Sequence, residues 1–252
     1  MDKCKPAETP IALGTELTKN GDEPTVNNTL YKQMVGSLMY FTATRLDLMY
    51  VVSLMSRFME SSKDSHWNVG KRILRYVAGT LGYGLWYTHT PDSTLTGYID
   101  SDFAGSIDDR KSTSGYAFHL GTNMITWASH KQPIVSMSSV EAEYVATTTA
   151  HCPVVWLRRL LKDMGYTRKY PTSIFCDNSS SIQLSKHNVF HRKNKHIDTR
   201  YHFIRELVNE KQISLLFCGS KEQLADMFTK PLVTSAFVFQ REHLGIGCVQ
   251  EV

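Results

Sequence analysis

The stretch YIDSDFAGS, residues 98–106, places two aspartates in a segment whose other residues are typical of a β-strand. A carboxylate that is buried without a partner costs several kcal/mol, so a buried strand that carries two of them needs a functional or structural reason. Side chains two residues apart on a strand lie on the same face, and Asp100 and Asp102 are therefore expected on one side of the sheet. From this stretch alone, either aspartate could bind a metal ion.

The composition indicates a globular protein. The chain has 252 residues, of which 42% are hydrophobic, and its five cysteines include no C-x-x-C pair. Reduced thiols inside a cell are therefore expected, rather than a disulfide framework or a zinc site. Arg45 and Asp47 interrupt the longest apolar stretch, and no signal peptide precedes it. We expect no membrane span and predict an intracellular location, in the cytoplasm or the nucleus.

Patterns along the chain indicate a helical part followed by a mixed α/β part. Residues 1–26 show no sustained period and are expected to form an extended arm. Apolar residues at helical spacing predict three amphipathic helices within residues 27–90. In residues 94–232, short runs rich in aromatic and β-branched residues are followed by alternating helices and strands. This order predicts a mixed sheet with at least one parallel pair and with helices packed on it. Residues 233–252 are expected to form an amphipathic tail.

Four acidic residues lie where predicted elements of the α/β part begin or end. Asp100 belongs to one strand and Asp177 ends another. Glu143 lies in the first turns of a long helix, and Asp226 lies near the start of a late helix expected over residues 221–230. Sites in α/β sheets gather at strand ends and helix N-termini, so these side chains are expected to converge. The alternative is that they are surface charges, since the chain has 24 acidic residues.

Converging carboxylates would need cations between them, because uncompensated buried charges repel one another. Hard oxygen ligands of this kind suit Mg²⁺. Two such ions about 4 Å apart would activate a water and stabilise the leaving oxygen in phosphodiester hydrolysis.

The neighbouring Glu141 has a structural role available. It follows Ser138 in the pattern S-x-x-E, which is typical of a capping box at a helix N-terminus. Glu143 points about 200° around the helix from Glu141, so only one of the two can face the site. We assign the site to Glu143.

Basic residues are concentrated in one segment. Residues 186–205 hold six lysines or arginines and four histidines against a single acid, Asp198. Such a patch is typical of a surface that binds a phosphate backbone, although a solvated helix face would carry the same charge. The loop DDRKSTSG, residues 108–115, presents groups that could contact phosphate and the 2′-OH of RNA, with a solvated turn as the alternative. The candidate nucleic-acid-binding residues are Arg110, Lys111, Ser112, Asn178, Arg192, Lys193, Lys195, His196 and Arg200.

Longer runs of sequence contain these same features. The run YIDSDFAGSIDDRKSTSGYAFHLGTNMITWASHKQPIVSMSSVEAEYVA, then WLRRLL, IFCDNSSSI, KHIDTRYHFIRE and EQLADMFTKPL, resembles the ribonuclease H domain of copia-type retrotransposon Pol polyproteins. Upstream, YKQMVGSLMYFTATRLDLMYVVSLMSRFM and HWNVGKRILRYVAGTLGYGLWY are similar to the thumb and connection region that ends the reverse transcriptase of that family. The resemblance covers roughly residues 27–232.

The resemblance implies both a fold and a site. The implied fold is a ribonuclease H-like α/β fold, a five-stranded mixed sheet flanked by helices, here preceded by a small helical subdomain. The implied site is an Asp, Glu, Asp, Asp set that binds two Mg²⁺ ions, or Mn²⁺, and cuts the RNA strand of an RNA/DNA hybrid. Its members fall on Asp100, Glu143, Asp177 and Asp226. Asp102 then becomes a neighbour of the site rather than a ligand.

Two departures from the family pattern bear on stability and function. Leu46 stands in TATRLD where the family usually has proline, a change expected to affect stability more than chemistry. No Y-x-D-D of a polymerase palm occurs, so the chain is expected not to polymerise and to lack the upstream polymerase domain of the polyprotein. Two hypotheses follow: a Mg²⁺-dependent ribonuclease H, and a catalytically inactive nucleic-acid-binding remnant. The oligomeric state stays open.

Overall fold

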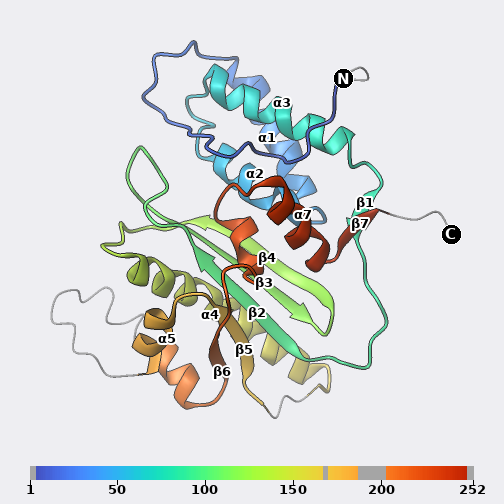
Figure 1. The fold of residues 1–252 in the computed structure, drawn as a ribbon, viewed down its shortest axis with the longest axis vertical. Coiled ribbons are helices and arrows are strands. Elements are labelled where there is room, and N and C mark those ends of the chain that lie inside the picture. The colour runs from blue at the N-terminus through green and yellow to red at the C-terminus, as the bar shows by residue number, and fades with distance from the viewer. Residues whose placement is uncertain (1–3, 167–169, 187–202, 249–252) are drawn as a thin grey trace.

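A group of helices forms the first part of the chain. The computed structural model describes residues 4–166, 170–186 and 203–248. Asn27 caps the first helix, because its side chain accepts hydrogen bonds from the N–H groups of Thr29 and Leu30. The elements of this part are α1 (Asn28–Phe41), the 3₁₀-helix η1 (Leu46–Leu48), α2 (Met49–Ser56) and α3 (Asp64–Ala78). Figure 1 shows these helices gathered at one end of the molecule, beside the sheet.

A five-stranded mixed sheet forms the second part. Its strands lie in the order β4-β3-β2-β5-β6; β2 is antiparallel to β3, and β3 to β4, whereas β2–β5 and β5–β6 are parallel pairs. The strands are β2 (Leu95–Ser101), β3 (Thr113–Leu120), β4 (Asn123–Lys131), β5 (Thr172–Cys176) and β6 (Ile213–Phe217). The long helix α4 (Ser139–Asp163), the short helix α5 (Ser179–Lys186) and a helical turn at residues 203–209 connect the later strands. The predicted five-stranded mixed sheet flanked by helices is confirmed.

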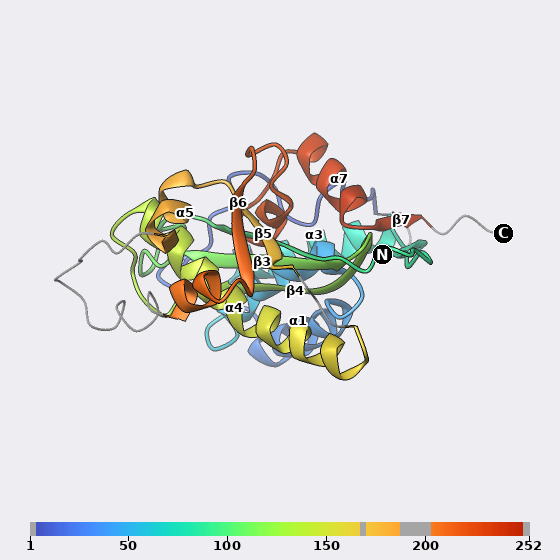
Figure 2. The same cartoon turned by 90° about the horizontal axis from the view of Figure 1, so that it is seen from below.

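The two faces of the sheet bury two separate apolar clusters. On one face, Ile99 and Phe118 pack with residues of α4 and α5. On the other face, Ala117 and Met124 join the core of the helical part and Phe228. Figure 2 shows α4 on one side of the sheet and α7 (Thr234–His243) on the other. Because side chains alternate along a strand, Asp100 points away from the face that Ile99 contacts.

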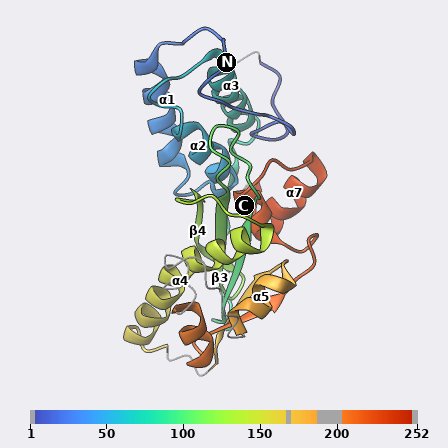
Figure 3. The same cartoon turned by 90° about the vertical axis from the view of Figure 1, so that its left-hand side faces the viewer.

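The helical part is attached to the β3–β4 side of the sheet. The Ser53 hydroxyl donates to the Ser129 carbonyl at 2.8 Å, and the indole N–H of Trp127 donates to the Thr42 carbonyl at 3.0 Å. Figure 3 shows α1, α2 and α3 at one end of the molecule and α4 and α5 at the other. Leu46, at the position where the resemblance led us to expect proline, is fully buried in η1.

The helix predicted over residues 221–230 is shorter than expected and is not an α-helix. A five-residue 3₁₀-helix, η2 (Leu224–Phe228), occupies this position. The Gln223 side chain holds its start, because the amide oxygen accepts from the Ala225 N–H at 3.1 Å and the amide nitrogen donates to the Ile99 carbonyl at 2.8 Å. Pro231 disfavours helical geometry at the residue before it, so a regular helix does not continue beyond this turn.

Residues beyond η2 return to the helical part. The strand β7 (Ile246–Cys248) pairs antiparallel with β1 (Tyr83–Leu85). Phe237, Leu244 and Ile246 are buried in the same cluster as α1, α2 and α3. Much of the segment expected to be a tail is therefore packed structure, while the division of the chain into domains stays a prediction. Within the described residues, no helix combines the length and the apolar character that crossing a membrane requires.

Candidate metal centre

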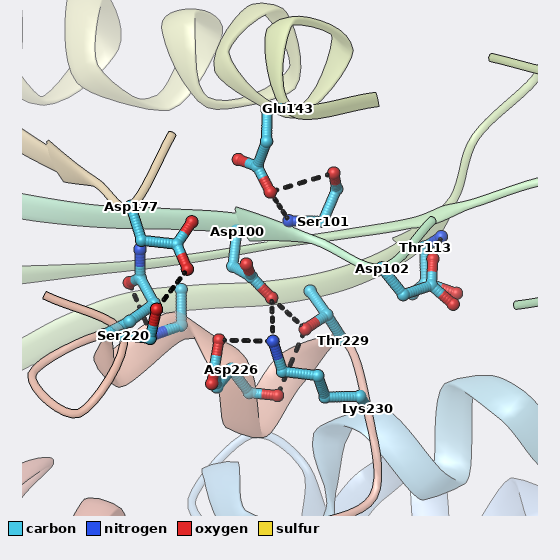
Figure 4. Close-up of polar contacts among 12 residues, drawn as sticks. Asp100, Ser101, Asp102, Thr113, Glu143, Asp177, Ser220, Asp226, Thr229 and Lys230 are labelled. Carbon is cyan, nitrogen blue, oxygen red and sulfur yellow. Dashed lines mark hydrogen bonds and ion pairs between the residues drawn. The ribbon is translucent and has the colours of Figure 1, made fainter. Parts of the chain in front are cut away.

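Four acidic side chains from four separate elements meet at one end of the sheet. Asp100 is the second-to-last residue of strand β2, and Asp177 directly follows β5. Glu143 lies near the start of α4, and Asp226 lies in η2. Carboxylate oxygens of Asp100, Asp177 and Asp226 lie within 4.8 Å of one another, and Glu143 lies equally close to Asp177. Figure 4 shows the four side chains directed toward a common region. The structure thus brings together the four acids that the sequence singles out.

A glycine in the neighbouring strand allows η2 to reach Asp100. Gly115 of β3 is the register partner of Asp100. A Cβ atom at Gly115 would lie 2.6 Å from the Cβ of Phe228 and 2.9 Å from the Cγ2 of Thr229, both far inside ordinary contact distance. Because this position has no side chain, η2 lies directly on the sheet and carries Asp226 to the aspartate on β2.

Two residues that sequence reasoning missed, Thr229 and Lys230, directly follow η2 and contact the acids. The Thr229 hydroxyl donates to Asp100 Oδ2, and Thr229 is fully buried. The Lys230 ammonium lies 2.8 Å from Asp226 Oδ1 and 3.6 Å from Asp100 Oδ2. The spacing of Asp226 and Lys230, four residues apart, is a local signal that could have suggested their pairing. Their joint approach to Asp100 depends on the tertiary contact at Gly115.

Glu143 is held by the end of strand β2. Its Oε1 accepts from the backbone N–H of Ser101 at 2.9 Å and from the Ser101 hydroxyl at 3.2 Å. On the other oxygen, the Cys176 thiol approaches Oε2 at 3.7 Å. Ser138 caps α4 as predicted, because its hydroxyl accepts from the Glu141 N–H, whereas the Glu141 carboxylate accepts from the N–H of Met137, one residue before the cap.

Burial and the charge of Asp100 raise the pKa values of the other three acids. Burial, followed by the charge of Asp100, raises the pKa of Glu143 well above its ordinary value and that of Asp226 to about 7. The same two causes raise the pKa of Asp177, whose Oδ2 accepts from the Ser220 hydroxyl at 3.3 Å. Burial alone would lower the pKa of Lys230, but Asp100 and Asp226 outweigh it and raise that pKa. The cluster therefore favours bound protons or cations.

The donor set fits a divalent cation that prefers oxygen. Every acid of the cluster offers carboxylate oxygens, which are the ligands that Mg²⁺ and similar hard ions select. Burial, with the Glu143 charge, raises the pKa of the Cys176 thiol, so this group stays protonated and is a poor ligand for such an ion. The cluster could hold a divalent cation through Asp100, Asp177 and Asp226, with Glu143 beside them.

Asp102 lies apart from this cluster. It follows the end of β2, and its carboxylate accepts from the Thr113 N–H. Together with Arg57 and Arg110 it lines a cleft of about 540 Å³ between the N-terminal arm, α2 and the β2–β3 loop. Burial raises the pKa of Asp102 to about 6. Asp100 therefore belongs to the acid cluster, whereas Asp102 belongs to the cleft.

The predicted nucleic-acid-binding residues have differing environments. Arg110 is exposed beside the cleft, and Lys111 is half-buried. Ser112 is fully buried and its hydroxyl accepts from the Ala104 N–H at 3.0 Å, so in this conformation it offers no contact to an external ligand. Asn178 caps the start of α5 by accepting from the Ser181 N–H at 2.9 Å. The remaining candidates lie outside the described residues: Arg192, Lys193, Lys195, His196 and Arg200.

Comparison with known proteins places the chain in a family. No model of a protein family matches the chain. The chain is 39% identical to the Retrovirus-related Pol polyprotein from transposon TNT 1-94 of Nicotiana tabacum, over 98% of this chain and 19% of the relative. It is also 39% identical to that from transposon RE2 of Arabidopsis thaliana, over 98% of this chain and 17% of the relative. The solved structure of LC11-RNase H1, isolated from compost, is 15% identical with a TM-score of 0.40, covering 54% of this chain and 93% of that one.

The fold and the site define a mixed α/β protein with an acidic centre suited to a divalent cation. The chain belongs to the copia-type retrotransposon Pol polyproteins. It spans less than a fifth of the length of the relatives described above.

Proposed function

We propose that this protein is a ribonuclease H that hydrolyses the RNA strand of RNA/DNA hybrids endonucleolytically with Mg²⁺, or with Mn²⁺ in its place. The observation that carries the proposal is the convergence of Asp100, Glu143, Asp177 and Asp226 from four elements. A purely structural role would not explain this convergence, because each additional buried carboxylate raises the cost of the others. The same four residues match the acidic set of the family it resembles.

The chain's own residues would prepare the site for phosphodiester hydrolysis. Asp100, Asp177 and Asp226 would hold two ions together with Glu143. The Ser101 N–H and hydroxyl orient Glu143, and the Thr229 hydroxyl orients Asp100. When bound, the ions would supply an activated water and positive charge at the leaving oxygen.

The family context extends the proposal to partners and place. The substrate partner is an RNA/DNA hybrid, and the upstream polymerase domain of the polyprotein would present that hybrid to the site. The Arg110 and Lys111 loop would contribute phosphate contacts, together with the basic residues of the segment 186–205. The activity would take place inside the cell, in the cytoplasm or the nucleus.

Cleavage of a labelled hybrid tests the proposal. The wild type is incubated with an end-labelled RNA/DNA hybrid in Mg²⁺, beside Asp177→Asn and the matched control Asp163→Asn, whose side chain is exposed at the end of α4. We expect internal cuts in the RNA strand by the wild type and the control, and a loss of about 100-fold or more in Asp177→Asn. Duplex DNA and duplex RNA serve as substrates that should remain intact.

The alternative function has its own signature in this assay. A wild type that cuts the hybrid no faster than Asp177→Asn, yet binds it in a salt-dependent way, is a nucleic-acid-binding remnant without catalysis. That result would overturn the enzyme proposal.

A further inference from the structure

Lys230 places a positive charge inside the acid cluster. Among the described residues it is the cation in ion-pair contact with these acids, at 2.8 Å from Asp226 Oδ1 and 3.6 Å from Asp100 Oδ2. Figure 4 shows its ammonium group between the two carboxylates. We propose that Lys230 is a built-in counter-ion of the cluster, which a divalent cation must displace and which thereby sets the metal concentration at which the site fills. This inference rests on the metal site of the proposed function.

The contacts of Lys230 coincide with those that a metal ion would need. Asp100 and Asp226 are two of the three acids whose oxygens lie within 4.8 Å of one another, and the ammonium contacts both. An ammonium at these oxygens opposes a divalent cation in two ways, by occupying their lone pairs and by electrostatic repulsion. Filling this side of the site therefore requires the ammonium to move.

The structure holds the backbone of Lys230 while leaving the side chain free to move. The Lys230 N–H donates to the Asp226 carbonyl at 3.2 Å, and the preceding Thr229 is fully buried. In contrast, the side chain of Lys230 is 40% exposed, while those of Asp100 and Asp226 are 2% and 10% exposed. A rotation about side-chain bonds would carry the ammonium into solvent without disturbing η2.

The balance of charge explains why this counter-ion would be exchanged rather than permanent. When all four carboxylates are ionised, one ammonium offsets only one of their charges, so the cluster keeps a strong attraction for a further cation. In the absence of metal, Lys230 lessens the repulsion between Asp100 and Asp226 and so stabilises the fold. In the presence of metal, it competes for the same oxygens.

Three variants separate these effects. Lys230→Met removes the charge at similar length, and Lys230→Arg keeps a charge. Lys221→Met is the matched control, because this exposed lysine just before η2 changes the net charge equally. Thermal unfolding is measured in EDTA and in Mn²⁺, and Mn²⁺ binding is measured by calorimetry and by electron paramagnetic resonance.

We expect Lys230→Met to lower the Tm in EDTA and to bind Mn²⁺ at least about tenfold more tightly than the wild type. Lys221→Met should resemble the wild type in both measurements, and Lys230→Arg should bind Mn²⁺ no more tightly than the wild type. If Lys230→Met folds only when Mn²⁺ is present, that result also supports the inference. If it does not fold in either condition, Lys230→Gln is judged by the same two measurements.

Two failures can be told apart. A folded Lys230→Met, or Lys230→Gln in its place, whose Mn²⁺ affinity is unchanged or weaker overturns the inference while leaving the metal site intact. A wild type and variants that all bind no Mn²⁺ overturn the inference and the proposed metal site together.

Discussion

Substituting Gly115 by alanine should force η2 away from the sheet. The new Cβ would lie 2.6 Å from Phe228 Cβ, 2.9 Å from Thr229 Cγ2 and 3.2 Å from the Ala225 carbonyl oxygen, whereas carbon atoms in good contact are about 3.5–4.0 Å apart. None of these atoms is the end of a long, flexible side chain that could rotate away. The segment that carries η2 must therefore shift by about 1 Å.

The cost of this shift follows from the overpacking of a well-packed core. An added methyl group in such a place destabilises a protein by about 1–3 kcal/mol, of which the removal of a strand glycine offsets about 0.5–1 kcal/mol. We therefore expect a net loss of about 0.5–2 kcal/mol in the free energy of unfolding. The matched control is Gly84→Ala in strand β1, where an added Cβ meets nothing within 4 Å; it should be neutral or slightly stabilising.

Urea denaturation in EDTA measures the stability difference, and calorimetry with Mn²⁺ measures the site. Because Asp226 moves with η2 while Asp100 stays on β2, Gly115→Ala should also weaken Mn²⁺ binding and slow hybrid cleavage by about 10- to 100-fold. A Gly115→Ala protein as stable as the wild type and with the same Mn²⁺ affinity would refute the argument that this glycine sets the position of η2.

Three further predictions concern individual acidic residues and a buried ion pair. Asp100→Asn should reduce hybrid cleavage by about 100-fold or more, whereas Asp102→Asn should stay within about tenfold of the wild type in the same assay; equal losses would contradict their separation. In metal-free protein the raised pKa of Asp226, about 7 against an ordinary 3.8, adds stability below pH 3.8 that is lost as the pH rises through 7. The Tm difference in EDTA between the wild type and Asp226→Asn should therefore shift against the wild type from pH 5 to pH 8, and a pH-independent difference would exclude this titration. Arg45 pairs with Asp47 through two hydrogen bonds of 3.0 and 2.8 Å, so Arg45→Met should lose about 3–5 kcal/mol in urea denaturation by leaving a buried carboxylate without its cation. A loss below about 1 kcal/mol would show that the hydrogen bond from the Tyr76 hydroxyl is enough to stabilise Asp47.

The candidate site could be named from the sequence because its acids occupy recognisable local positions. Asp177 follows an apolar strand. Glu143 lies just inside a helix whose start the sequence indicates through the S-x-x-E pattern of Ser138 and Glu141. These features depend on residues close together in the chain, so composition and spacing reveal them. The strand series and the long helix follow from the same kind of local signal.

The tertiary structure alone decided how these parts meet. Propensity favoured a regular helix around Asp226, yet the Gln223 contact with strand β2 and the Pro231 that follows produce a short 3₁₀-helix. Ser112, whose hydroxyl the sequence suggested as a nucleic-acid contact, is buried in the structure. The packing of residues 234–248 on the helical part likewise gave no local signal beyond amphipathicity.

The opening stretch shows the same division. Its sequence determined that two aspartates stand at the end of a strand and therefore need partners. Their partners come from different segments: Thr229 and Lys230, which follow η2 far along the chain, contact Asp100, whereas the Thr113 N–H of the next strand, β3, donates to Asp102. Local periodicity encodes elements, whereas which side chains meet depends on long-range contacts such as the close approach of η2 at Gly115, which have no periodicity to read.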